Sequence, residues 1–131
     1  MNVPKDLKYT QDHEWARLEG KAAIVGITDY AQDQLGSIVF VELPPLGKSV
    51  KKGETVVTVD SVKAVAEVYS PFSGEVEETN ESLKDVPEMI NQDPYGQGWM
   101  VKIKYSDPSQ LDGLMSPEAY QAFLAEEEAK G

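Results

Sequence analysis

The 131-residue chain is 40% hydrophobic and 27% charged, which predicts one globular domain. Its formal net charge is −11. Because an acidic surface repels phosphate, no nucleic-acid partner is expected. The chain has no cysteine and one histidine, so disulfides and thiolate metal sites are excluded and an autonomous hydrolase is disfavoured. No apolar run approaches the roughly 20 residues of a membrane span, and the N-terminus lacks signal- and transit-peptide features, so a cytoplasmic protein is expected, although a mature organellar form would look the same.

Most of the chain predicts short strands separated by turns. Residues 13–18 and 22–27 flank the break Glu19-Gly20-Lys21, as the two arms of a hairpin do. Thr28 or Asp29 is placed to cap a short helix over residues 30–35, which Gly36 ends. Runs rich in β-branched and aromatic residues then predict strands at 38–41, 54–60, 65–69, 74–78 and 99–105.

The end of the chain changes character. Residues 117–129 predict a C-terminal helix that Ser116 or Pro117 opens. Tyr120, Phe123 and Leu124 share one face of this helix and are expected to pack on the core. No linker or low-complexity tract divides the sequence, so residues 1–131 are expected to form a single domain.

Residues 60–64, Asp60-Ser61-Val62-Lys63-Ala64, lie between two expected strands and predict the tip of a hairpin. Because the tip contains neither Gly nor Asn, a type I turn with Val62 and Lys63 at negative φ is favoured over a type I′ turn. A lysine there is sterically open while the strands hold its backbone, which suits an enzyme that must modify one amine. On these residues alone, an ordinary solvated turn lysine is the alternative.

The sequence around Lys63 resembles the Glu-Ser-Val-Lys-Ala attachment sequence of the glycine cleavage system H protein family, with Asp60 in place of Glu. The resemblance continues in family order over most of the chain. The matching segments are 9–10, 13–15, 26–32, 35–36, 39–44, 68–71, 73–76, Asn91, 93–95 and 98–100. So many ordered matches argue against chance similarity.

This resemblance implies a mainly β fold, a flattened antiparallel barrel-sandwich hybrid of the lipoyl/biotinyl-domain type with short helices and a C-terminal helix. It also implies lipoic acid in amide linkage on Lys63, carried by a subunit with no catalysis of its own, so the single domain would be a lipoyl carrier. The implied partners are the pyridoxal-phosphate glycine decarboxylase (P protein), the tetrahydrofolate-dependent aminomethyltransferase (T protein), dihydrolipoamide dehydrogenase (L protein) and a lipoyl-attaching enzyme. The arm's disulfide would accept the aminomethyl group of glycine.

The resemblance further points to a resting cleft for the arm, formed by Glu14, Ile27, Leu35 and Glu67. A carboxylate there could hydrogen-bond the protonated amine of the loaded arm, while Ile27 and Leu35 could line the groove. Position 67 is Glu where the family often has Asp, which leaves open which carboxylate contacts the amine. Ordinary strand-face packing or solvation is the alternative for all four residues.

Asp60 and Gly74 are the residues that the resemblance connects with the attaching enzyme, because they lie three positions before and eleven after Lys63. A turn that needs a special glycine conformation would also explain Gly74. His13 is expected to pack or hydrogen-bond near Trp15, since no catalytic partners accompany it.

Four rival interpretations remain. A biotinyl carrier usually has methionines beside its lysine, whereas the neighbours here are Val62 and Ala64. A lipoyl domain of a 2-oxo acid dehydrogenase would lead into a linker and an acyltransferase core. A plain acidic scaffold would use Lys63 only as a solvated turn residue. An H-like protein that relays lipoyl groups to other enzymes would share the fold, and the sequence separates it poorly from the glycine cleavage carrier.

Overall fold

Antiparallel strands dominate the computed structural model, which describes residues 2–130. The elements in chain order are β1 (Lys8–Tyr9), β2 (Glu14–Glu19), β3 (Ala22–Ile27), α1 (Asp29–Leu35), β4 (Ile38–Glu42), β5 (Ser49–Val50), β6 (Thr55–Ser61), β7 (Val65–Tyr69), β8 (Gly74–Thr79), η1 (Glu81–Lys84), α2 (Met89–Gln92), β9 (Val101–Tyr105), η2 (Pro108–Gly113) and α3 (Pro117–Lys130). One sheet has the strand order β1-β2-β3-β9-β8-β5 and the other β4-β6-β7. None of the described helices is long and apolar enough to cross a membrane.

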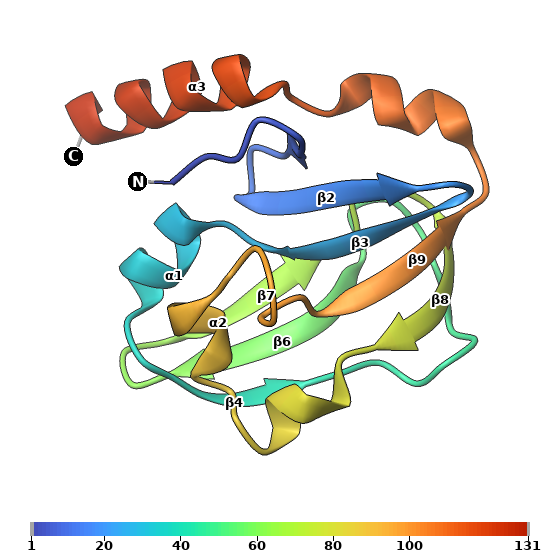
Figure 1. Ribbon diagram of the computed structural model, residues 1–131, viewed down its shortest axis with the longest axis horizontal. Coiled ribbons are helices and arrows are strands. Elements are labelled where there is room, and N and C mark those ends of the chain that lie inside the picture. Colours follow the sequence, from blue (N-terminus) through green and yellow to red (C-terminus); the bar gives the residue numbers. More distant parts are fainter. Residues whose placement is uncertain (1, 131) are drawn as a thin grey trace.

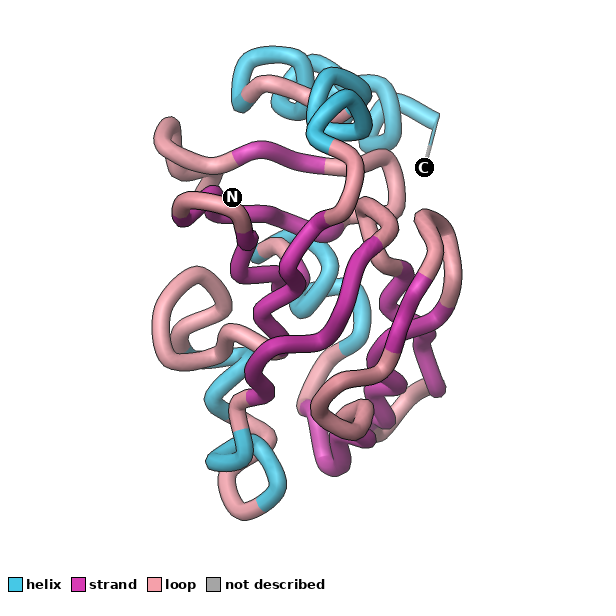
Figure 2. The backbone as a smooth tube through the Cα atoms, turned by 90° about the vertical axis from the view of Figure 1, so that its right-hand side faces the viewer, coloured by secondary structure: helices cyan, strands magenta, loops and turns pink. Residues whose placement is uncertain are grey.

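The two sheets lie face to face, with α1 and α2 at one end and α3 running past β1 and β2 (Figure 1). Figure 2 shows the same layers after a quarter turn. The main core fills the space between them, with Val25 and Ile103 from the larger sheet and Val57 and Val59 from the smaller. Within residues 2–130 no strand pairing joins the sheets into a closed barrel. The expected mainly β fold with short helices and a C-terminal helix is therefore confirmed.

The elements with strong local signals form as expected. Helix α1 has Thr28 as its N-cap, whose Oγ1 accepts a hydrogen bond from the Ala31 N–H at 3.3 Å, and it ends at Gly36 with φ +77°. The hairpin of β2 and β3 turns at Gly20. The elements missed from the sequence are β1, β5, η1, α2 and η2, which are too short to produce a periodic pattern.

Helix α3 packs through the face expected from the sequence. Tyr120 and Leu124 are buried and Phe123 is half-buried in a second cluster of apolar side chains. The Tyr120 ring stacks on Tyr9 at 4.6 Å between centroids. His13 belongs to the same region, because its ring packs against Phe123 and its Nδ1 lies 2.9 Å from the Tyr120 hydroxyl. The second cluster also contains Trp15.

Gly26 is a position where the packing of Trp15 leaves no space for a side chain. The two residues pair across β2 and β3, and a Cβ added to Gly26 would lie 2.8 Å from the indole ring. The ring is fully buried and donates from Nε1 to the Pro94 carbonyl oxygen at 3.0 Å, so it has little freedom to move. We expect Gly26→Ala to lower the free energy of unfolding by about 2 kcal/mol in denaturant titration, because overpacking a core strains it.

Gly113→Ala provides the matched control for Gly26→Ala. A Cβ at Gly113 would meet only the far end of a lysine side chain, at 3.4 Å, and Gly113 does not have a positive φ. It should therefore keep the wild-type unfolding free energy to within about 0.5 kcal/mol. Equal stability of the two variants would contradict the packing account.

Candidate functional site

Lys63 lies at the tip of the hairpin formed by β6 and β7, and its side chain is exposed. The Ser61 hydroxyl oxygen accepts hydrogen bonds from the backbone N–H groups of Lys63 (3.1 Å) and Ala64 (3.0 Å). The Val62 N–H donates to the Ser37 carbonyl oxygen at 3.0 Å, which ties the tip to the chain between α1 and β4. Among the described non-glycine residues only His13 has a positive φ, so the expected negative φ at Val62 and Lys63 is confirmed.

The aliphatic part of the Lys63 side chain runs past the end of α1. A Cβ added to Gly36 would lie 3.3 Å from Lys63 Cε and 3.7 Å from Cδ, and Gly36 also has φ +77°. The positive φ is what favours glycine at this position, where the helix ends, and the flexible lysine side chain passes over it. The outer part of the side chain thus passes Gly36, the residue directly after Leu35, which ends α1.

The hydrogen bonds to the Ser61 hydroxyl are expected to hold the backbone of the hairpin tip in place, and this can be tested. In Ser61→Ala the Lys63 and Ala64 amides lose their acceptor, and because both are exposed to water the loss of stability should stay below about 1 kcal/mol. We expect faster amide hydrogen exchange at these two residues. Ser61→Thr keeps an oxygen in place and should retain the slow exchange; equal rates in the two variants would contradict a role for the hydroxyl.

A pocket of about 200 Å³ lies beside α1 and β7 and brings together the four residues expected around a resting arm, Glu14, Ile27, Leu35 and Glu67. Five elements or their flanking turns contribute to it. Its lining comprises Asp12, His13, Glu14, Ile27, Tyr30, Ala31, Gln34, Leu35, Val59, Ala66, Glu67 and Val68. Most of these side chains are apolar, so the pocket suits a hydrocarbon chain better than a sugar or a phosphate.

Glu14 places a buried carboxyl group at this pocket. Only 2% of the residue is exposed, and its two carboxyl oxygens accept hydrogen bonds from the Thr10 hydroxyl (2.8 Å) and the Tyr69 N–H (3.1 Å). Burial raises the pKa of Glu14 to about 7, although the two hydrogen bonds act in the opposite direction. The group therefore gains or loses a proton close to neutral pH.

Glu67 is in a different environment from Glu14. It is exposed and pairs with Thr58, which in turn pairs with Glu42, so the three side chains share the outer face of the smaller sheet. Its Oε2 accepts a long hydrogen bond, 3.4 Å, from the Tyr69 hydroxyl. Glu67 thus borders the pocket from the solvent side, whereas Glu14 lies within the protein.

The two residues connected with the attaching enzyme do not lie together. Asp60 is on β6 next to the tip, but Gly74 begins β8 in the other sheet, beyond the far end of β7 (Figure 1). The turn explanation for Gly74 is wrong, because it is not among the glycines with positive φ. Glycine is needed there because a Cβ would overlap the Lys104 carbonyl oxygen on β9.

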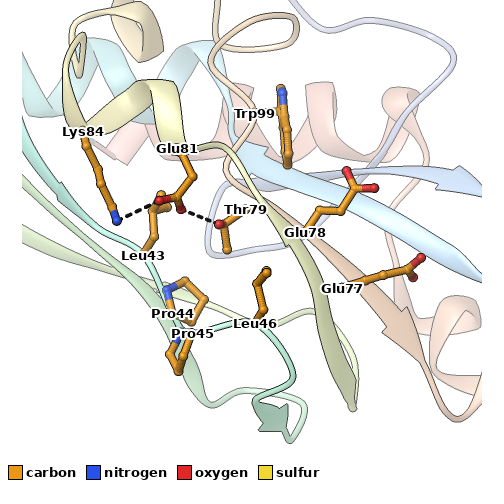
Figure 3. Close-up of a pocket in the computed structure, with 10 residues that line it drawn as sticks. All are labelled: Leu43, Pro44, Pro45, Leu46, Glu77, Glu78, Thr79, Glu81, Lys84 and Trp99. Carbon is orange, nitrogen blue, oxygen red and sulfur yellow. Dashed lines mark hydrogen bonds and ion pairs between the residues drawn. The ribbon is translucent and has the colours of Figure 1, made fainter.

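A larger groove, about 680 Å³, lies elsewhere on the molecule and contains none of the expected site residues (Figure 3). It runs between residues 43–46 and β8, with Trp99 on one wall. Glu81 accepts a hydrogen bond from Thr79 (2.6 Å) and pairs with Lys84 (2.8 Å) at its edge. Residues 2–130 hold no group of three or more His, Asp or Glu side chains arranged for a metal ion.

A family model described as "Glycine cleavage H-protein" matches residues 7–127. The chain belongs to the glycine cleavage H-protein family. The glycine cleavage system H protein of Anaeromyxobacter sp. (strain K) is 56% identical over 98% of this chain and 100% of its own length. That of Symbiobacterium thermophilum is 54% identical over 95% and 98%. A crystal structure of a glycine cleavage system H protein from Mycobacterium marinum superposes with a TM-score of 0.82 and 35% identity, covering 92% of this chain and 97% of that one.

Membership of the H-protein family removes three of the rival interpretations, namely the biotinyl carrier, the dehydrogenase lipoyl domain and the plain scaffold. The structure also adds residues that sequence reasoning missed. Gly36 and Ser61 arrange the tip, while Thr10 and Tyr69 hold the Glu14 carboxyl group. Gly36 had a local sequence signal as the end of a helix, and that signal did not connect it with Lys63.

Proposed function

We propose that this H-protein family member carries a lipoyl group in amide linkage on Lys63 and serves as the mobile carrier of the glycine cleavage system. The observation that carries the proposal is the position of Lys63 within the family's attachment sequence, exposed on a hydrogen-bonded hairpin tip. Its side chain lies along Gly36, next to a helix that lines an apolar pocket.

The residues of the pocket fit such a group. Ile27, Leu35 and Val59 offer apolar surface to a hydrocarbon arm, and the amide bond would remove the charge of Lys63. When bound, the lipoyl group supplies a disulfide that takes up the aminomethyl group of glycine with two electrons, chemistry that a cysteine-free chain lacks.

The chain's own residues would hold and protect the arm's end. Glu14, once ionised, places a negative charge against an apolar wall, where a cationic amine gains a charge-assisted hydrogen bond. We favour Glu14 over Glu67 for this contact, because Glu67 is exposed on the outer face of the sheet. Burial beside Ile27 and Leu35 would keep water away from the amine.

The proposed partners are the P, T and L proteins, namely glycine decarboxylase, aminomethyltransferase and dihydrolipoamide dehydrogenase, with the chain itself a carrier without catalysis of its own. A tether retains the group between these active sites and gives it an effective concentration on the order of mM in each. The relatives from Anaeromyxobacter and Symbiobacterium are bacterial, which supports a cytoplasmic setting.

Intact mass spectrometry with peptide mapping tests the attachment. Protein made in a host that lipoylates proteins should carry one lipoyl group, and the modified peptide should contain Lys63 and none of the other lysines. An unmodified Lys63 in the presence of a competent attaching enzyme would overturn the proposal.

A further inference from the structure

The smaller sheet exposes apolar side chains at the end that carries Lys63. Of the seven large hydrophobic residues exposed within the described part of the chain, four are Val39 and Phe40 on β4, Val62 at the tip and Val65 on β7. The strand pairing shifts register between Ile38 and Phe40, and at this irregularity two consecutive residues of β4 are exposed. Exposed apolar side chains that gather in one place mark interaction surfaces.

These apolar residues flank an acidic side chain. Phe40 pairs with Asp60, and Asp60 pairs with Val65, so the three form one row across β4, β6 and β7 on the outer face. Phe40 is 55% exposed and Val65 67%. A carboxylate between two apolar side chains loses water when a partner covers the row, and a cation facing it then interacts more strongly than on an open surface.

The neighbouring row extends the negative charge. Glu42, Thr58 and Glu67 pair in the same way one step further from the tip. No ion pair among residues 2–130 involves Asp60, Glu42 or Glu67. The outer face thus presents Phe40 and Val65 on either side of Asp60. The acids Glu42 and Glu67 lie in the next row, and Lys63 lies at the edge of this face.

We propose that the row Phe40–Asp60–Val65 is the surface by which the lipoyl-attaching enzyme recognises this chain, through an apolar face that carries an Arg or Lys opposite Asp60. The inference rests on the proposed function and names the partner that uses this surface. It assigns the recognition to a three-residue row in which Phe40 and Val65 act together with the acid.

The attaching enzyme is the partner that most needs this surface. It must select Lys63 from eleven lysines in the chain before any arm exists, whereas later enzymes can hold the arm itself. Charge alone selects poorly on a protein with a net charge of −11, because acidic side chains lie throughout the sequence. The apolar pair Phe40 and Val65 around Asp60 is what distinguishes the surface beside Lys63 from the surroundings of the other lysines.

The test is the rate at which a purified lipoyl-attaching enzyme modifies the unlipoylated full-length chain, followed by intact mass. Phe40→Thr and Val65→Thr keep residues that suit a strand, and each should lower kcat/KM roughly tenfold, as loss of an apolar contact at the centre of an interface does. Leu46→Thr is the matched control, since Leu46 is 67% exposed but lies in the groove of Figure 3. It should be modified at the wild-type rate.

A second measurement tests whether Phe40, Asp60 and Val65 act together. Asp60→Asn should reduce the rate more in the wild-type background than in Phe40→Thr/Val65→Thr, because the apolar pair strengthens the contact with the acid. Direct binding of the enzyme to Lys63→Arg, with and without the two threonines, should show the same loss. Wild-type rates in both single variants, or an equal loss in Leu46→Thr, would overturn the inference.

The outcomes separate the inference from the proposed function. If wild-type chain accepts no lipoyl group, the proposed function fails. If it does and the threonine variants react equally fast, only the docking surface fails. Thermal unfolding of each variant identifies loss of the fold. Phe40 and Val65 lie on different edge strands, so if one variant fails to fold, the other alone can test the docking surface.

Discussion

Lys63→Arg is expected to abolish glycine–CO2 exchange with a cognate glycine decarboxylase while leaving the fold intact. Arginine keeps the charge and approximate length, but its guanidinium stays protonated at all accessible pH values and cannot form the amide. Because Lys63 is exposed at a turn, the free energy of unfolding should change by no more than about 0.5 kcal/mol. Incorporation of labelled bicarbonate into glycine should fall to the level measured without carrier, and the lipoyl mass increment should disappear.

Lys51→Arg is the control for this prediction, since Lys51 is an exposed lysine ahead of β6. It should keep both the mass increment and the exchange. Residual exchange by Lys63→Arg would contradict the assignment of Lys63. A lipoylated wild-type chain that supports no exchange would instead favour the role of relaying lipoyl groups to other enzymes.

Local chemistry made part of this site predictable. Thr28 and Gly36 indicate the two ends of α1, and in the structure Thr28 caps the first turn and Gly36 follows the last helical residue. The tip at Lys63 was predictable because alternating strands flank residues 60–64. The identity of the attached group did not follow from any of these features. It came from the ordered resemblance along the chain, which the family match supports.

Long-range pairing made the rest unpredictable. Glu14 and Glu67 are both acids in strands, but one is buried and the other exposed because their strands meet different neighbours. The register shift in β4 exposes both Val39 and Phe40. It cannot be recognised from the sequence, because residues 38–41 are all apolar. A turn was only the alternative explanation for Gly74, and the close approach of β9 to its backbone could not be foreseen because no local signal shows it.

Glu14→Gln is expected to stabilise the protein at neutral pH. The pKa of Glu14 rises from an ordinary value of 4.5 to about 7 on folding because the carboxyl group is buried. Between these pH values the unfolded chain releases a proton that the folded chain retains, so the wild-type free energy of unfolding falls as pH rises, by about 3 kcal/mol in total. Glutamine has no such titration. The Thr10 hydroxyl can rotate to accept from the new amide, and the Tyr69 N–H keeps an oxygen acceptor.

Denaturant titration of the wild type and Glu14→Gln between pH 4.5 and 8 checks the direction of this pH dependence. The advantage of Glu14→Gln should grow through this window and level off above pH 7, whereas Glu67→Gln, which alters an exposed carboxylate, should track the wild type. Parallel curves for Glu14→Gln and wild type would contradict the account. The same variant should support slower glycine–CO2 exchange, since the pocket would lose the charge proposed to hold an amine. A residue that lowers stability at neutral pH and raises activity belongs to a functional site, because packing alone would favour the glutamine.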